Sequence, residues 1–430
     1  MTDSLVVVMD GSIVGTIFRL KGGRLRFDYA DDYRDQTGAT PLSLSMPTQV
    51  RSHPDSAITP WLWGLLPDNN LVLARWAREF HVSASSPFSL LSTPIGEDCA
   101  GAVQFVAPDQ VDGLLARSGD VTWLTDDDVA ERLRELRRDS TAWLGMTFTG
   151  QFSLAGAQAK TALIFQDGHW GVPSGSTPTT HILKPAVAGF DDHDLNEHLC
   201  LDAARRVGLL AVRTRVARFD DESVVIVDRY DRQVRGSEIL RVHQEDLCQA
   251  MGVAPSAKYQ NEGGPGPIDI VKLLRGVMPP RVADVAVNRF ADALIWNWLI
   301  AGTDAHAKNY SLLLAQDQVR LAPLYDVASA LPYGTHEKKL RLAMKVGGDY
   351  GVAPVRNTWT GASRDLGMDA DTLRTRVLEL GALAPYAFAD AANQPDIVAL
   401  KRPMPGKLVD LVAERANRCM RLIGTPGDLA

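Results

Sequence analysis

The sequence lacks the features that would place it in several large classes of protein. Its 430 residues contain no run approaching the ~20 apolar residues of a membrane span, and the opening MTDSLVVVMDGS lacks the basic start and long apolar stretch of a signal peptide. Only four cysteines are present, far apart and without a CxxC pair, which argues against a disulfide framework and a zinc site. We therefore expect a cytoplasmic protein with no membrane contact.

An excess of positive charge is also missing. Against 52 Asp and Glu there are 45 Lys and Arg, and the formal net charge of −7 argues against a surface devoted mainly to nucleic acid. With 45% hydrophobic and 23% charged residues, the composition is that of an ordinary soluble globular protein. A chain of this length accommodates two or three domains of about 100–200 residues each.

The first part of the chain carries signals for strands and for two helices. Residues 4–30 alternate apolar and polar side chains around two glycine-containing breaks, which predicts a small antiparallel meander. The stretch 59–82 has helical spacing after Pro67, and 127–143 predicts a charged, exposed helix. The composition loosens between residues 105 and 126, where we place the first candidate domain boundary.

From residue 150 the pattern changes twice. Residues 152–173 predict a loop, a strand, an Asp-Gly turn and a strand, and HILKPA predicts another strand. A helix is expected over 194–208 and a hairpin over 212–232. Beyond residue 240 the chain is mostly helical, with the strongest helical spacing at 284–301. A β-rich half followed by a helical half predicts an α+β fold with two lobes.

The run AGTDAHAKNY, at residues 301–310, places chemical groups directly behind that helix. Asp304 is followed by Asn309, then by a short predicted hairpin, and then by Asp326. Phosphoryl transfer needs such a set, because one carboxylate accepts the proton of the attacking hydroxyl while an amide oxygen and a second carboxylate hold Mg²⁺ on the phosphates. The D-x4-N spacing matches the protein-kinase catalytic loop, although the HRD and DFG motifs are absent. The alternative is a polar helix C-terminal turn, in which Asp and Asn are common.

A kinase also needs a phosphate-covering loop, a lysine and a glutamate, and the β-rich half supplies candidates for all three. Gly150 and Gly156 lie in TGQFSLAGAQAK, where a missing Cβ would let backbone N–H groups approach phosphate oxygens. Lys184 lies in the strand HILKPA and Glu197 in the helix that follows, while residues 228–230 could present backbone to an adenine ring. The alternatives are that Lys184 protects an exposed strand edge and that Glu197 is a solvated helix acid.

Several segments resemble the HipA-type toxin serine/threonine kinases of bacterial type II toxin–antitoxin systems. They are SLAGAQAKTAL, PTTHILKPA, NEHLCL, QEDLCQAMG, KYQNEGGPG, GTDAHAKNYSLLL and LAPLYDVASA. The early segments VVVMDGSIVGTIFRL and PLSLSMP resemble the N-terminal subdomain of that family. The resemblance implies a two-lobed, protein-kinase-like fold. Residues 1–110 would form the N-terminal subdomain, 140–235 a kinase N-lobe with the nucleotide-binding loop, and 240–430 a helical C-lobe with the catalytic loop.

The resemblance also implies a role for each site residue. Asp304 matches the catalytic aspartate, Asn309 and Asp326 match the metal ligands, and Ser153 matches the serine that the family phosphorylates on itself. The implied ATP-binding residues are Ala155, Gly156, Ala157, Gln158, Ala159, Lys160, Lys184, Asp228, Arg229, Tyr230, His306, Ala307, Lys308, Asn309 and Tyr325. Ala159 departs from some relatives, which carry an acid there; little consequence is expected because the backbone does the binding.

Cofactors and partners follow from the same resemblance. It implies ATP and Mg²⁺ as cofactors, a HipB-like helix-turn-helix antitoxin as partner, and operator DNA reached mainly through that antitoxin. The implied substrate is a protein, which is glutamyl-tRNA synthetase in the best-known members. Two alternatives stay open: a small-molecule phosphotransferase that shares Asp…Asn…Asp, and a non-catalytic co-repressor that acts with a DNA-binding antitoxin.

Other polar and aromatic residues fit structural roles. Trp296 and Trp298 are core residues by their helical spacing. Arg415, Arg418 and Arg421 lie about one turn apart on a predicted terminal helix. They form either a solvated or dipole-matched face or a contribution to DNA contact.

Overall fold

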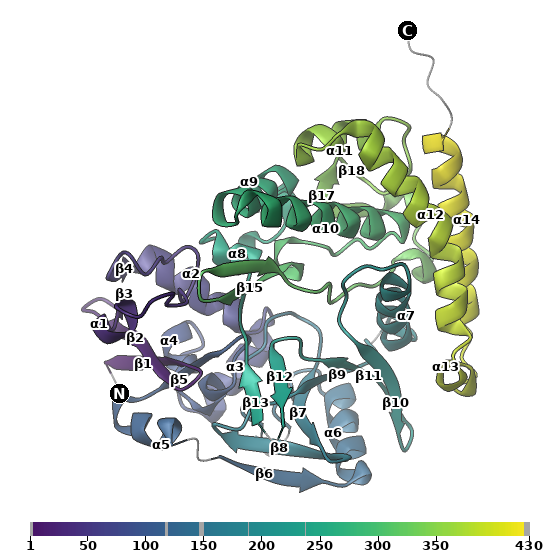
Figure 1. The fold of residues 1–430 in the computed structure, drawn as a ribbon. Coiled ribbons are helices and arrows are strands. Elements are labelled where there is room, and N and C mark those ends of the chain that lie inside the picture. Colours follow the sequence, from purple (N-terminus) through teal and green to yellow (C-terminus); the bar gives the residue numbers. More distant parts are fainter. Residues whose placement is uncertain (1–2, 117–118, 146–149, 188, 237, 425–430) are drawn as a thin grey trace. The chain divides into compact units, whose positions relative to one another are not determined.

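A computed structural model describes residues 3–116, 119–145, 150–187, 189–236 and 238–424 (Figure 1). The chain separates into two compact units, each assembled from three stretches. Unit 1 comprises Met1–Pro185, Ala217–Ser256 and Ser311–Val319; unit 2 comprises Ala186–Val216, Ala257–Tyr310 and Arg320–Ala430. The division into three consecutive domains stays a prediction.

Unit 1 begins with an antiparallel sheet whose strand order is β4–β3–β2–β1–β5. The registers of β1 with β2 and of β2 with β3 confirm the meander expected over residues 4–30. Its first turn places Asp10 and Gly11 at φ of 44° and 77°, as a two-residue hairpin turn requires. The strands are β1 (Ser4–Met9), β2 (Ser12–Arg19), β3 (Leu25–Tyr29), β4 (Ser52–Pro54) and β5 (Val103–Val106).

Short helices pack with this sheet around one core. Trp61 and Trp76 have no exposed surface, and the same core continues to Trp143 and Phe152, next to the predicted nucleotide loop. The predicted loop therefore begins against the core of the N-terminal subdomain. The helices are α1 (Asp31–Arg34), α2 (Asp55–Leu65), α3 (Asn70–Glu79), α4 (Pro87–Leu91) and α5 (Val111–Leu115), with 3-10 turns η1 (Pro94–Glu97) and η2 (Pro108–Gln110).

A second sheet has the order β10–β11–β9–β7–β8–β6 and is accompanied by α6 (Asp126–Arg138). The stretch 105–126, where we placed a candidate domain boundary, contains β6, which pairs along its whole length with β8; the boundary itself stays a prediction. The side chains of β6 are exposed or half-buried, that of Trp123 included, so the strand has no buried apolar face that the sequence could reveal. The strands are β6 (Gly119–Leu124), β7 (Thr161–Gln166), β8 (His169–Gly175), β9 (His181–Pro185), β10 (Thr214–Phe219) and β11 (Glu222–Asp228).

Smaller elements follow, most of them in unit 1; only the last residues of η3 and β16 belong to unit 2. Strands β12 and β13 pair with each other, and β14, β15 and β16 form a three-stranded sheet that contains the hairpin expected after Asn309. The bounds are β12 (Arg232–Arg235), β13 (Glu238–Arg241), β14 (His243–Asp246), α8 (Leu247–Ala250), η3 (Pro255–Ala257), β15 (Ser311–Ala315) and β16 (Gln318–Leu321).

Unit 2 is mostly helical, with α10 at its centre. Trp296 and Trp298 on this helix have no exposed surface, which confirms them as core residues. Trp298 meets Trp359 edge-on at 5.4 Å, and Trp296 stacks on Phe388 at 5.7 Å. Figure 1 shows α12 and α14 side by side along much of their length.

The elements of unit 2 have the following bounds: α7 (His193–Arg206), η4 (Gln260–Glu262), α9 (Pro267–Val277), α10 (Pro280–Leu299), η5 (Ala307–Asn309), η6 (Leu331–Tyr333), η7 (Glu337–Lys339), β17 (Arg341–Val346), β18 (Asp349–Gly351), α11 (Thr358–Leu366), α12 (Ala370–Ala392), α13 (Pro395–Ala399) and α14 (Met404–Gly424). Within the described ranges, every helix is too short or too polar to cross a membrane. All four cysteines are buried free thiols.

Candidate active site

The predicted nucleotide loop, residues 155–160, lies in unit 1 and closes on itself. Lys160 Nζ donates to the carbonyl oxygen of Ala155 at 2.6 Å and lies over the ring of Trp143 at 4.8 Å. Gly156 has φ of +103°, and a Cβ there would lie 2.6 Å from Lys160 Nζ. The backbone conformation therefore favours glycine at position 156, whereas Lys160 Nζ, at the end of a flexible side chain, could move away from a Cβ.

The stretch that leads into this loop is tied to the N-terminal subdomain. Ser153 is fully buried; its Oγ donates to the carbonyl of Leu65 at 2.9 Å and its N–H to the carbonyl of Asp98 at 2.9 Å. The carbonyl of Gly156 accepts from the N–H of Asp68 at 3.0 Å. A kinase could reach the Ser153 hydroxyl only after this stretch leaves its contacts.

Two neighbours in the loop differ in their surroundings. The Nε2 atom of Gln158 is buried and has no hydrogen-bond partner in the part of the chain that the structure describes. An orphaned donor of this kind suits an anionic ligand. Ala159 packs against the core of the subdomain, which explains why a small apolar residue is well placed there.

Lys184 lies inside a sheet and not at its edge. It is 6% exposed and pairs with Val225, and its strand β9 lies between β11 and β7. The strand-edge alternative for Lys184 is therefore wrong. At the end of β11, Asp228 lies opposite His181, whose Nε2 is 3.4 Å from Asp228 Oδ1.

The side chain of Arg229 belongs to a buried ion-pair network. It is 1% exposed and donates to both carboxylate oxygens of Asp231, at 3.0 and 2.7 Å, and to Asp98 at 3.2 Å. Arg232 donates to the other oxygen of Asp98 at 2.8 Å. Any contact of Arg229 with a nucleotide must therefore come from its backbone, as a connector between lobes would provide.

Charges in this network stabilise each other. Burial alone would raise the pKa of Asp98 and Asp231, but the surrounding arginines, Arg232 and Arg229 above all, hold the pKa of both carboxyls below the ordinary value. Burial lowers the pKa of Arg241 to about 10, which still leaves it charged at neutral pH. The network is therefore fully ionised while it anchors residues 229–232.

The predicted catalytic base lies in unit 2, after the end of α10. The side chain of Asp304 is 67% exposed, and its Oδ1 accepts a hydrogen bond from the hydroxyl of Tyr259 at 2.7 Å. The Nε2 of His306 lies 4.0 Å from the same oxygen, and the ring of Tyr259 meets that of His306 edge-on at 5.0 Å. Sequence reasoning did not assign Tyr259, although KYQNEGGPG was among the segments that carried the resemblance.

Asn309 is oriented by the backbone of the base. Its Nδ2 donates to the carbonyl of Asp304 at 2.7 Å, so the amide oxygen is the atom left to face a cation. The hydroxyl of Tyr325 donates to the carbonyl of Lys308 at 2.6 Å, which fixes η5 to the residue before Asp326. The loop therefore places the predicted base and the predicted amide ligand on one short, internally bonded segment.

These donors suit a hard cation. The described residues contain no group of three or more His, Cys, Asp or Glu that could hold a metal by themselves. A kinase-type Mg²⁺ does not need one, because it takes one or two carboxylates and completes its shell with phosphate oxygens and water. An amide oxygen and a carboxylate, from Asn309 and Asp326, fit that requirement.

Glu197 and Arg415 are both buried, contrary to the solvated alternatives. Glu197 on α7 is 1% exposed, so the solvated interpretation is wrong. Arg415 is also 1% exposed and donates to the carbonyls of Trp298 and Leu299 at the end of α10, and to that of Val352. The dipole-matched interpretation applies to Arg415, because it stabilises the C-terminus of α10 directly before the catalytic loop.

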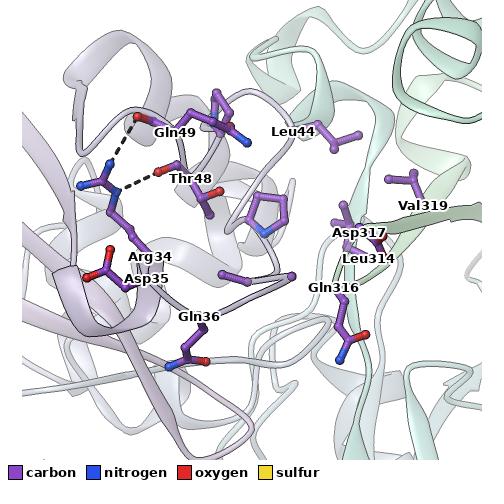
Figure 2. A pocket seen from close by; sticks show the side chains of 14 residues that line it. Arg34, Asp35, Gln36, Leu44, Thr48, Gln49, Leu314, Gln316, Asp317 and Val319 are labelled. Atoms are coloured by element: carbon purple, nitrogen blue, oxygen red, sulfur yellow. Dashed lines mark hydrogen bonds between the residues drawn. The ribbon is translucent and has the colours of Figure 1, made fainter.

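A hollow of about 510 Å³ lies elsewhere in unit 1 (Figure 2). Its wall includes Arg34, which donates to the carbonyls of Thr48 and Gln49, and Gln316 on the turn between β15 and β16. The residues that line it include none of those predicted to bind ATP or metal. The site is therefore defined by its chemical groups and not by this hollow.

An α+β fold with the order Gly loop, lysine, helix glutamate, Asp…Asn and Asp defines the protein-kinase-like class. Among solved structures, a chain of the Shewanella oneidensis toxin–antitoxin system HipA, HipB and operator DNA complex matches with a TM-score of 0.82. The match covers 97% of each chain at 22% identity, and it confirms the predicted fold class.

Family models and curated relatives then name the family. The model of the HipA-like C-terminal domain matches residues 152–386, and that of the HipA N-terminal domain matches residues 5–106. The Sinorhizobium fredii protein Y4mE is 32% identical over 96% of this chain and 97% of its own length. The serine/threonine-protein kinase toxin HipA of Shewanella oneidensis is 27% identical over 94% of each chain. The chain belongs to the HipA family, and the enzyme class predicted from the sequence, a serine/threonine-protein kinase, is confirmed.

Proposed function

We propose that this chain is the toxin of a type II toxin–antitoxin system and uses ATP and Mg²⁺ to phosphorylate a serine or threonine of another protein. The observation that carries the proposal is the geometry of the catalytic loop. The Asp304 carboxylate is exposed, while the amide of Asn309 is bonded to the Asp304 backbone. A base and a cation ligand on one segment are what phosphoryl transfer to a hydroxyl requires.

Each residue then has a role. Asp304 accepts the proton of the attacking hydroxyl, and Asn309 and Asp326 hold Mg²⁺, which when bound offsets the negative charge of the phosphates. The ATP-binding residues are Ala155 to Lys160, Lys184, the backbone of Asp228 to Tyr230, His306 to Asn309, and Tyr325.

The family resemblance supports a substrate in translation, with glutamyl-tRNA synthetase as the first candidate. A HipB-like helix-turn-helix antitoxin restrains the kinase and brings it to operator DNA. With a net charge of −7, the chain alone should bind duplex DNA weakly and with a shallow salt slope. A gel shift that shows tight, sequence-specific binding without the antitoxin would refute this part of the proposal.

Ser153 is the proposed site of autophosphorylation. A phosphate there adds about 1.5–2 negative charges. It could not keep the buried bond from Ser153 Oγ to Leu65. Modification should therefore displace the nucleotide loop and switch the kinase off, and transfer between two molecules is the easier geometry. After incubation with ATP and Mg²⁺, mass spectrometry should find Ser153 phosphorylated and the product should bind ATP poorly. A phosphorylated form with unchanged ATP affinity would contradict the idea.

A phosphoproteomic comparison of cells that express the wild type and Asp304→Ala tests the function. We expect one or a few proteins to be phosphorylated only with the wild type. If labelled phosphate appears on a metabolite instead, the chain is a small-molecule phosphotransferase. If no transfer occurs but the operator is repressed together with an antitoxin, the chain is a non-catalytic co-repressor.

A further inference from the structure

Asn196 makes a two-point contact with the chain segment that follows Asp326. Its side chain is fully buried on α7, its Nδ2 donates to the carbonyl of Ser329 at 2.7 Å, and its Oδ1 accepts from the N–H of Ser329 at 3.0 Å. One planar amide thus satisfies both backbone groups of a single residue. Among side chains only Asn and Gln carry a donor and an acceptor in this arrangement.

The remaining capacity of the amide is also used. Nδ2 donates a second hydrogen bond to the hydroxyl of Tyr333 at 3.1 Å, and Oδ1 accepts from the thiol of Cys200 at 3.3 Å. A buried polar group with all its partners in place fixes one arrangement of the segments that it joins.

Ser329 connects this contact to the start of the catalytic loop. Its Oγ donates to the carbonyl of Ile300 at 2.6 Å, and the next residue, Ala330, donates its N–H to the carbonyl of Ala301 at 3.0 Å. Ile300 caps α10, and Asp304 follows four residues later. The segment after Asp326 is therefore bonded to α7 on one side and to the base of the catalytic loop on the other.

Asp326 itself needs such support. Its φ of 56° lies in the left-handed region, which residues other than glycine seldom adopt. A residue in this region stays there only when its surroundings hold it. Ser329, three residues later, is bonded both to α7 and to the C-cap of α10.

We propose that Asn196 is a positioning residue for the metal site: through Ser329 it holds Asp326 at a fixed place relative to Asp304 and Asn309. The inference rests on the proposed role of Asp326 as a metal ligand. Residues that orient metal ligands typically change metal affinity by about 10–100-fold when they are replaced.

The test measures metal binding directly. Mn²⁺ is titrated into the full chain with a non-hydrolysable ATP analogue, and the electron paramagnetic resonance signal of free Mn²⁺ reports the dissociation constant. For Asn196→Ala and Asn196→Asp we expect this constant to rise about tenfold or more. Asn196→Asp keeps the volume and the acceptor for the Ser329 N–H but loses the donor, so it carries the test if Asn196→Ala folds poorly. Tyr333→Phe, which removes one half-buried hydroxyl, should give a smaller rise.

A matched control uses the same helix. His198 Nδ1 and Thr214 Oγ1 form a hydrogen bond of 2.9 Å, and Thr214→Val removes it. This variant should lower the thermal unfolding midpoint but leave Mn²⁺ binding unchanged. The proposal is overturned by wild-type Mn²⁺ binding in folded Asn196→Asp and in Tyr333→Phe, or by equal weakening in Thr214→Val. The proposed function fails separately if Asp326→Ala keeps both Mn²⁺ binding and phosphoryl transfer.

Discussion

The two groups of predicted site residues are held in opposite ways. In unit 1 a side chain fixes the backbone that would serve the nucleotide, since the guanidinium of Arg229 is 1% exposed within its ion pairs. In unit 2 the backbone of Asp304 orients Asn309, while the carboxylate of Asp304 is 67% exposed. Replacing a side chain should therefore damage stability first in unit 1 and chemistry first in unit 2.

The largest effect is expected at the two acids of unit 2. Asp304→Ala should lower phosphoryl transfer by about 10²–10⁴-fold because the substrate hydroxyl loses its proton acceptor. Asp326→Ala should cause a comparable loss and also weaken Mg²⁺-dependent ATP binding, whereas Asp304→Ala should leave ATP affinity largely intact. Steady-state kinetics and nucleotide titrations measure both quantities. An equal loss of ATP affinity in the two variants would contradict the assigned roles.

In unit 1, replacement of Arg229 should affect stability much more than ATP binding. Arg229→Ala leaves Asp98 and Asp231 without a major partner, and breaking a buried ion pair costs about 3–5 kcal/mol. The free energy of unfolding, measured by denaturant titration, should fall by that amount. The accompanying loss in the free energy of ATP binding should be smaller. Arg134→Ala, which breaks exposed pairs with Asp220 and Asp221, is the control and should change stability little. Loss of ATP affinity at unchanged stability would mean that the Arg229 side chain binds ATP.

The stability of unit 1 should also depend on pH, through the buried carboxyl of Glu245. Glu245 on β14 accepts from the N–H of Leu44 at 2.8 Å, and burial raises its pKa to about 8. The folded state keeps this proton more tightly than the unfolded state, so the stability that it adds is complete below pH 4.5 and is lost as the pH rises to about 8. Glu245→Gln should remove this loss and raise stability near pH 8 by on the order of 4 kcal/mol.

Other titratable groups lie near Glu245, and their contributions must be separated from its own. Asp246 on the same strand and Tyr29 on β3 face it with negative or ionisable groups, and the Ser43 and Trp61 side chains are also near. Burial lowers the pKa of His243 to about 4, so this group destabilises the fold only on the acid side. Subtracting the unfolding curves of wild type and Glu245→Gln cancels the His243 contribution. If the difference in the free energy of unfolding between the two proteins stays constant from pH 5 to pH 8, the prediction is wrong.

The smallest effect is expected at Tyr259. Tyr259→Phe removes the hydroxyl bonded to the Asp304 carboxylate, and a net hydrogen bond contributes about 1 kcal/mol. We expect kcat to fall by about threefold to tenfold while KM for ATP stays unchanged, because the hydroxyl orients the base and does not touch ATP. Tyr350→Phe on β18 is the matched control, with no change expected. A fall in ATP affinity with unchanged kcat would remove this role.

Local sequence patterns predicted most helices and strands and the order of the candidate site residues along the chain. Alternation gave the meander, helical spacing gave α10, and the D-x4-N spacing located Asp304 and Asn309. Helix α2 (Asp55–Leu65) was missed, since helical spacing was recognised only after Pro67 and Pro60, which lacks an N–H, lies inside α2. Burial of Trp61 and Leu62 on its inner face outweighs that penalty.

Contacts between distant residues could not be predicted in this way. Tyr259 and Asp304 are 45 positions apart, and Asn196 and Ser329 are 133 apart. Such pairs leave no period in the sequence, so only the fold reveals that Tyr259 bonds to the Asp304 carboxylate and that Asn196 bonds to the backbone of Ser329. Arg229 shows the same limit, because the sequence predicted a backbone role for residues 228–230 but gave no sign that the Arg229 side chain is held by Asp98 and Asp231.

The position of Arg415 has a consequence for the synthesis of the enzyme. The carbonyl of Leu299, at the end of the helix that leads into the catalytic loop, accepts from a guanidinium 116 residues further along the chain. A nascent chain that has passed Asp304 therefore still lacks the group that stabilises the base of its catalytic loop. Kinase activity should therefore appear only after α14 has been translated and has docked on α10.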